Sequence, residues 1–424
     1  MVSALVPVFF ALLLFGLPIF ASLALAVTAI LYFTSGIDPL VVPMRMFSGM
    51  NNFSLMSIPF FILAAELMRI GGLSDRLIDL ARAMIGWLPG GLAAATVVAC
   101  LMFGSISGSS PATVIAIGAI MYPAMVNAGY DRFFAIGLIT TSGTLGPIVP
   151  PSIALIIYGS VTSTSVGKLF AAGLLPAVLI GTMLIAYASW YSARKGYPRD
   201  PFPSAERILH AFKRAAWGLG LPVILLGGIY TGVFTPTESA AAACIYGWFI
   251  GAVVYRTISM RDTLVILRNT GLLAGPLLLI TAGASAFSWL LANTGAPAQL
   301  ASYILSGTDN PVIIVALFNL ILLVAGCFLD SASAIIILAP LMQPIAAQVG
   351  VDPIHFGVIM LVNLSVGMLT PPVGLNLFVA MGIAKMTLFE VFRAALPTII
   401  LMVVALVLIS YIPTISTLVP SLLF

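Results

Sequence analysis

Charge is what this sequence has least of. Only 7% of its 424 residues are Asp, Glu, Lys or Arg, and 61% are hydrophobic, whereas a soluble domain carries about a quarter charged residues. This composition excludes an ordinary soluble protein. Apolar runs of about 20 residues recur along the chain, and each is long enough to cross a bilayer as a helix. The sequence therefore predicts an all-α, polytopic membrane protein embedded in lipid.

Metal-ligating and nucleophilic side chains are also scarce. The three cysteines, Cys100, Cys244 and Cys327, lie far apart in apolar sequence, and neither His210 nor His355 has a partner motif. These spacings predict no metal centre or disulfide. The membrane segments also lack a paired acid and base or a nucleophile motif, so the sequence does not predict an enzyme and no catalytic residue is expected.

The distribution of the few charged residues indicates how the chain is oriented in the membrane. The 17 basic residues outnumber the 13 acidic ones by four and gather in loops, a pattern that fits membrane orientation better than nucleic-acid binding. The most basic loop, residues 194–214, is predicted to be cytoplasmic. No charge precedes Asp38, and a cleaved signal would begin with basic residues, so we expect the N-terminus to be a retained membrane helix.

Two polar stretches, residues 104–152 and 326–376, are copies of one another. At an offset of roughly 221 positions Asp131 falls on Asp352, and the proline pair at 150–151 falls on the pair at 371–372. Each stretch opens with a polar tip between apolar segments and closes with a Gly- and Pro-rich break. A membrane chain that repeats itself with broken helices in matching places is typical of a secondary transporter whose site lies between the repeats.

The breaks offer oxygen ligands. Helix ends within the membrane expose unpaired N–H or C=O groups and partial dipole charges, and hydroxyl and carboxylate side chains lie at the same places. Such oxygens suit Na⁺. A different interpretation is that Gly and Ser there merely allow close helix packing. Asp330 is a functional-site hypothesis because a carboxylate in the membrane is costly, whereas Glu66 and Glu238 are equally compatible with structural roles at helix ends.

Outside these stretches the pattern predicts a bend at Gly16–Pro18, a loop over residues 38–52 and amphipathic interfacial helices over residues 73–87 and 204–217. Further membrane helices are expected over the ranges 54–69, 167–191, 219–233, 239–255 and 264–291, with a short segment at 298–305 and a closing helix from residue 388.

The segments GSISGSSPAT, GTLGPIVPPS, GVFTPTES, FLDSASA and GMLTPPVGLN resemble the large membrane subunit of the tripartite ATP-independent periplasmic (TRAP) transporters, and the resemblance covers nearly the whole chain. It implies an inverted repeat with two re-entrant helical hairpins, two broken helices, and elevator-type transport and scaffold domains. It also implies Na⁺-coupled uptake of an organic acid, such as a C4-dicarboxylate, sialic acid, another sugar acid or a 2-oxo acid, across the bacterial inner membrane.

The resemblance implies two partners, a periplasmic substrate-binding protein and a small four-helix membrane subunit. Since the chain begins directly with large-subunit sequence, we expect the small subunit to be a separate chain. The alternatives are a stand-alone carrier or antiporter of the same architecture without a binding protein, and a membrane scaffold or channel. The expected divisions are residues 1–88 (N-terminal scaffold and arm), 89–160 (first transport repeat), 161–308 (scaffold, arm and connecting helices), 309–385 (second transport repeat) and 386–424 (C-terminal helix).

Site residues follow from the resemblance, motif by motif. The first Na⁺ site would use Ser107, Ser109, Ser110, Gly143, Gly146 and Pro150. The second would use Asp330, Ser331, Ser333, Gly367, Thr370 and Pro371, although Asp330 could orient backbone instead of binding the ion. Substrate would lie between the two tips, near Ser152, Asn376, Thr113, Pro151 and Pro372.

Overall fold

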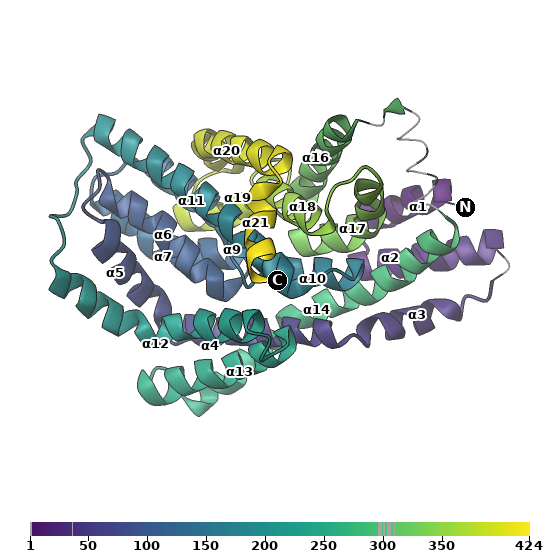
Figure 1. Cartoon of the computed structure of the whole chain (residues 1–424), viewed down its shortest axis with the longest axis horizontal. Helices are drawn as coiled ribbons and strands as arrows, with labels where there is room; N and C mark the ends of the chain where they lie inside the picture. The colour runs from purple at the N-terminus through teal and green to yellow at the C-terminus, as the bar shows by residue number, and fades with distance from the viewer. Residues whose placement is uncertain (1, 36, 296–298, 300–301, 303–306, 309) are drawn as a thin grey trace.

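Helices make up the whole fold in the part of the chain that the structure describes. The computed structural model describes residues 2–35, 37–295, 299, 302, 307–308 and 310–424. Within these residues eight helices are long and apolar enough to cross a membrane, or up to ten if each of two bent pairs is one span. The predicted all-α, multi-pass architecture is confirmed (Figure 1).

Two hairpins, each followed by a broken crossing, form the repeated core. In the first half, α6 (Gly91–Ser107) and α7 (Ser110–Asn127) make the hairpin, and α8 (Arg132–Ser142), α9 (Leu145–Ile148) and α10 (Ile153–Thr162) make the crossing. In the second half, α16 (Pro311–Phe328) and α17 (Ser331–Gln348) precede α18 (Pro353–Gly367) and α19 (Leu375–Ala384). Helices α7 and α17 are both 18 residues long, and both hairpins and both breaks stand where the sequence predicts them.

Matching capping residues explain why the crossings begin at equivalent positions. The Asp131 carboxylate accepts hydrogen bonds from the backbone N–H groups two and three residues further on, at the start of α8. Asp352 makes the same pair of hydrogen bonds at the start of α18. A capping carboxylate satisfies N–H groups that have no partner inside the helix. The duplicated aspartates therefore fix the same helix start in both halves.

Outer helices surround these two units. Helix α14 (Met260–Asn293) packs against α2 (Ile19–Ile30), α3 (Val41–Met50) and α4 (Ser57–Ile70), and these segments run together along the lower side of Figure 1. The remaining helices are α1 (Val2–Leu14), α5 (Leu73–Ile85), α11 (Val166–Lys195), α12 (Ala205–Tyr230), α13 (Pro236–Phe249), α20 (Leu388–Tyr411) and α21 (Thr414–Leu423). Short π-helical or 3-10 turns cover Leu31–Ser35, Phe53–Met56 and Ile250–Val254. The expected bend after α1 is present, with Gly16 at φ +83°.

Three expectations about the outer segments were wrong. The predicted loop over residues 38–52 contains α3, because Val42 is buried and Gly49 lies against Ser285 of α14. The segments 204–217 and 219–233 form one helix, α12, whose Gly218 makes room for the Leu73 side chain instead of ending the helix. The closing segment forms two helices, α20 and α21. Most of the segment predicted at 298–305 lies outside the described residues.

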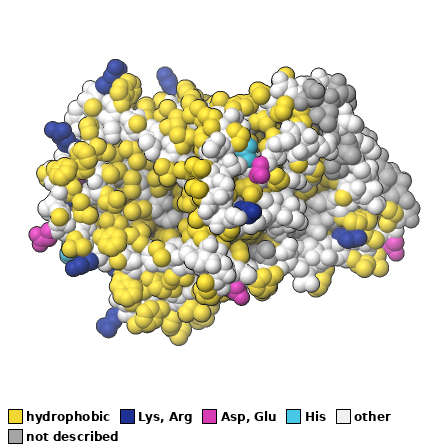
Figure 2. All heavy atoms as spheres, in the orientation of Figure 1, with side chains coloured by type: hydrophobic (Ala, Val, Ile, Leu, Met, Phe, Trp, Pro, Cys, Tyr) yellow, Lys and Arg dark blue, Asp and Glu magenta, His cyan; other side chains and the backbone are white. Residues whose placement is uncertain are grey.

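Ion pairs join the two amphipathic segments. Helix α5 bends by 74° from α4, and Arg214 on α12 pairs with Asp79 on α5 at 3.1 Å. Arg82 on α5 pairs with Asp200, in the loop before α12, at 2.8 Å. The predicted amphipathic helices therefore exist and contact one another, whereas their depth in a bilayer stays a prediction. In Figure 2, hydrophobic side chains gather on the left and lower parts of the face, with few charged side chains among them.

Candidate functional site

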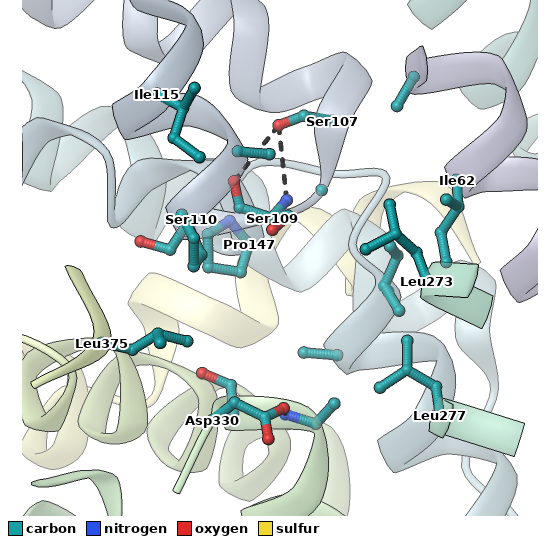
Figure 3. Close-up of a pocket in the computed structure, with 18 of the residues that line it drawn as sticks. Ile62, Ser107, Ser109, Ser110, Ile115, Pro147, Leu273, Leu277, Asp330 and Leu375 are labelled. Atoms are coloured by element: carbon teal, nitrogen blue, oxygen red, sulfur yellow. Dashed lines mark hydrogen bonds between the residues drawn. The ribbon is translucent and has the colours of Figure 1, made fainter. Parts of the chain in front are cut away.

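The two hairpin tips face a common cavity. It has a volume of about 760 Å³ and is bounded by both tips, by residues next to the two breaks, and by α4 and α14. In Figure 3, Ser107, Ser109 and Ser110 of the first tip lie on one side, Asp330 and Leu375 on another, and Leu273 and Leu277 of α14 on a third. The tips, which lie more than 200 residues apart in the sequence, therefore meet at one site.

A cluster of oxygens forms at the first tip. The Ser107 and Thr113 hydroxyls lie 2.9 Å apart, and Thr113 Oγ1 donates to the Ser109 carbonyl at 2.8 Å. Gly146, in the break of the first crossing, lies against this cluster: a Cβ there would stand 2.6 Å from both the Ser109 carbonyl oxygen and Thr113 Oγ1. The absence of a side chain at Gly146 therefore allows the break to approach the tip oxygens.

The second tip is built differently, because its helix is capped by a carboxylate. Asp330 Oδ2 accepts from the backbone N–H groups of Ala332 and Ser333 at 3.0 and 3.2 Å. Its Oδ1 accepts from the Ser333 hydroxyl. Ser109, at the equivalent position of α7, makes no such side-chain hydrogen bond. The positive end of the α17 dipole is thus neutralised by Asp330, whereas that of α7 is open towards the cavity.

A glycine contact holds each break against its hairpin. A Cβ on Gly104 would stand 2.9 Å from the Gly146 Cα, and a Cβ on Gly326 would stand 2.9 Å from the Gly367 Cα. Both pairs join the hairpin helix just before the tip to the following break. Small residues of this kind let helix backbones approach closely. The packing interpretation of these glycines therefore holds, and the same contacts bring the breaks next to the tips.

The second break also reaches across to the first tip. Asn376 at the start of α19 donates from Nδ2 to Ser110 Oγ at 2.6 Å. Both side chains are buried, and the Asn376 Oδ1 has no hydrogen-bond partner among the described residues. The Ser142 hydroxyl beside the first break is buried and unpartnered in the same way. Unpaired buried oxygens are costly, and a bound cation would satisfy them.

The structure brings some of the predicted residues to the cavity and leaves others behind it. Ser107, Ser109, Ser110, Asp330 and Ser331 line the cavity. Thr113 belongs to the oxygen cluster of the first tip. Ser152 is fully buried and caps α10, and it is not part of the cavity wall. Ser333 of the second tip does not line the cavity either. The other predicted residues come from the breaks, and none of them lines the cavity: Gly143, Gly146, Pro150, Pro151, Gly367, Thr370, Pro371 and Pro372. Both proline pairs have cis peptide bonds.

Sequence reasoning did not predict the wall formed by the outer helices. On α4 it consists of Ile62, Ala65, Glu66 and Arg69, which recur at helical spacing on one face. The sequence of α4 is apolar on most sides, so its pattern does not show which face of the helix contacts the hairpin tips. Glu238 has a structural role, since it forms a capping box with Thr235 at the start of α13.

Paired hairpins, paired breaks and a cavity between them define the class: a multi-pass membrane transporter. The family described as "Tripartite ATP-independent periplasmic transporter, DctM component" matches residues 6–415. The chain belongs to this family, the membrane permease component of a tripartite transporter in the bacterial inner membrane.

Relatives agree with this assignment. The chain is 42% identical to the C4-dicarboxylate TRAP transporter large permease protein DctM of Rhodobacter capsulatus, with 97% of each chain covered. It is 43% identical to DctM of Vibrio cholerae (97% and 96% covered) and 36% identical to the sialic acid permease SiaM of that organism (97% and 96% covered). These relatives are named as permeases and not as enzymes. Among solved structures, the Alcanivorax borkumensis YdaH transporter shares the fold, with a TM-score of 0.62 and 16% identity over 90% of this chain and 89% of that one.

Proposed function

We propose that this chain is the Na⁺-coupled transport subunit for an organic acid anion, with a C4-dicarboxylate as the leading candidate. The cavity shared by the two hairpin tips is the observation that carries the proposal. Its wall contains the open N-terminus of α7, which favours an anion. Three relatives that are 41–43% identical to this chain are named C4-dicarboxylate permeases, and this is why succinate is the first compound to test.

Coupling to Na⁺ is supported by the oxygen atoms around the tips. The first site would use the hydroxyls of Ser107 and Thr113 and the Ser109 carbonyl. Two further buried oxygens have no partner among the described residues: Ser142 Oγ beside the first break, and Asn376 Oδ1, whose side chain contacts Ser110. Neutral oxygen donors without cysteine or histidine suit a hard monovalent cation. Na⁺ bound there would order the first tip before the substrate binds.

The second tip would work through Asp330 in its capping role. Because both carboxylate oxygens already accept hydrogen bonds from the start of α17, Asp330 would hold the tip in shape while backbone carbonyls of the second break, including those near Gly367 and Thr370, approach the ion. Asp330 thus orients the backbone of the tip and does not coordinate the ion directly.

Movement would follow an elevator mechanism. The hairpins and broken crossings, two copies of opposite orientation, would move as a body against α4, α14 and the other outer helices, and so carry the cavity across the membrane. A periplasmic binding protein would deliver the substrate, and a small four-helix membrane subunit would complete the complex.

The test is uptake of labelled succinate into proteoliposomes that contain the complete purified complex. We expect uptake to require an inward Na⁺ gradient and to saturate with substrate, because a carrier has a limited number of sites. Uptake that is indifferent to Na⁺ would remove the coupling claim, and current that does not saturate would indicate a channel. Omitting the binding protein is the control: uptake by this chain alone would favour the stand-alone carrier.

A further inference from the structure

One face of α4 places an ion pair in the wall of the cavity. Glu66 and Arg69 line the cavity together with Ala65 and Ile62, which lie one and two turns before Arg69 on the same face. Among the described residues of the wall, Arg69 is the only one that carries a positive charge. It lies on an outer helix, whereas the serine-rich tips belong to the hairpins.

Glu66 holds Arg69 without using all of its hydrogen bonds. The Arg69 Nε donates to Glu66 Oε1 at 3.2 Å and its Nη2 donates to Oε2 at 2.7 Å. A guanidinium has five N–H donors in a fixed plane, so the Nη1 edge remains available. Both side chains line the cavity, and the arginine is the more exposed partner, with 39% of its side chain exposed against 16% for Glu66.

The other charges of the wall leave Arg69 as the place for a second anionic group. Asp330 is engaged by the start of α17, and the opposite tip offers the uncapped N-terminus of α7. Anion-binding groups therefore stand on two different walls of one cavity. A monocarboxylate would use one of them, whereas a dicarboxylate would use both.

We propose that Arg69 is a substrate-binding residue that takes the second carboxylate of a dicarboxylate while the first lies at the α7 tip. This inference rests on the proposed function and adds to it an outer-helix residue that selects substrates with two acidic ends. Glu66 acts as a positioning residue, because it holds the guanidinium plane towards the cavity.

A merely structural ion pair is the competing explanation. Arg69 lies in the last turn of α4, where a cation is favourable, and a pair three residues apart on a helix is a common stabilising contact. The two explanations differ in what happens when both charges are removed. If the ion pair is only structural, removing both charges together restores the wild-type KM for succinate. If Arg69 binds substrate, the double variant still lacks the guanidinium and its KM stays raised.

The experiment compares Arg69→Gln, Glu66→Gln and the double variant in the complete reconstituted complex, with succinate as the probe. We expect Arg69→Gln to raise the KM for succinate about tenfold or more, since a charge-assisted hydrogen bond is lost. The double variant keeps the raised KM. Glu66→Gln raises the KM by less than Arg69→Gln does, because the guanidinium is still present but is no longer held by the carboxylate. Arg82→Gln is the matched control, because Arg82 is also ion-paired but lies on α5 away from the cavity wall, and its KM stays at the wild-type value.

A second measurement tests the two-ended substrate directly. In detergent with Na⁺, succinate should raise the thermal midpoint of the wild-type permease more than butyrate does, and in Arg69→Gln the two acids should act equally. Recovery of the wild-type KM by the double variant, or equal effects of both acids on the wild type, would overturn the role of Arg69. These outcomes are distinct from failure of the proposed function, in which wild-type succinate uptake itself shows no Na⁺ dependence.

Discussion

Asn376 Nδ2 donates a 2.6 Å hydrogen bond to Ser110 Oγ, and so joins the second broken crossing to the first hairpin tip. The two residues are 266 positions apart in the chain. Because this bond crosses from one repeat to the other, the first tip and the second break cannot move independently while it is intact. The Asn376 Oδ1 that remains is buried and unpartnered, and this combination makes Asn376 the first residue to vary.

We predict that Asn376→Ala raises the Na⁺ concentration for half-maximal uptake about fivefold or more. The variant removes an oxygen that can coordinate the ion, and it leaves the Ser110 hydroxyl without its hydrogen bond. The expected change is equivalent to about 1 kcal/mol. Na⁺ titration of succinate uptake measures it. Asn127→Ala at the exposed end of α7 is the control and should leave the Na⁺ dependence unchanged. Equal Na⁺ curves for Asn376→Ala and the wild type would remove Asn376 from the ion site.

Gly146→Ala should abolish uptake while Gly275→Ala leaves it intact. A methyl group at Gly146 would stand 2.6 Å from two oxygens of the first tip. One is the backbone carbonyl oxygen of Ser109, and the other is Thr113 Oγ1, which donates a hydrogen bond to that carbonyl. Gly275 on α14 has no described residue within 4 Å of the added Cβ, and alanine there favours the helix by about 0.5–1 kcal/mol. The measurement is the uptake rate of each variant and of the wild type at equal amounts of reconstituted protein. An active Gly146→Ala variant would show that the close approach is dispensable.

Two variants of Asp330 separate the effect of its capping hydrogen bonds from the effect of its negative charge. Asp330→Asn keeps a capping side chain, so we expect uptake with a Na⁺ dependence close to that of the wild type. Asp330→Ala loses the cap, at a cost of about 1 kcal/mol, and we expect weaker Na⁺ dependence because the tip is no longer held in shape. Asp352→Ala, which loses an equivalent cap at the start of α18, controls for general destabilisation. A severe Na⁺ defect in Asp330→Asn would instead indicate direct coordination by the carboxylate.

The loop residue Asp200 gives a pH-dependent contribution to stability. Its hydrogen bond with Arg82 lowers the pKa of Asp200, and the hydrogen bond with Arg207 acts in the same direction. A lowered folded-state pKa means that the stabilisation is present at neutral pH and is lost as the pH falls below about 4, through the folded-state pKa. The ion pair is partly exposed, so the contribution is about 0.5–1 kcal/mol.

The thermal midpoints of the wild type and Asp200→Asn measure this effect in detergent between pH 7 and pH 3.5. The wild type should have the higher thermal midpoint at pH 7, and the difference in thermal midpoint between the two proteins should become smaller as the pH approaches 3.5. A difference that is constant over the whole range would show that the stabilisation does not depend on ionised Asp200.

The helices of the repeat were readable from local sequence. Apolar runs set the membrane segments, and the tips and breaks are marked by Gly, Ser and Pro that interrupt those runs at matching positions. Loop 38–52 shows where this reasoning failed. The sequence pattern predicted a loop there, but the segment forms α3, in which Gly49 fits closely against Ser285 of α14. The local sequence does not contain that contact.

The sequence by itself determined the membrane class, the repeat and the identity of the tip residues, because helix length, helix breaking and capping are set within a few neighbouring residues. Tertiary structure alone decided that Ser110 meets Asn376 and that the Arg69 face of α4 lines the cavity. These facts depend on which helix faces turn towards one another, and packing between distant segments fixes that choice.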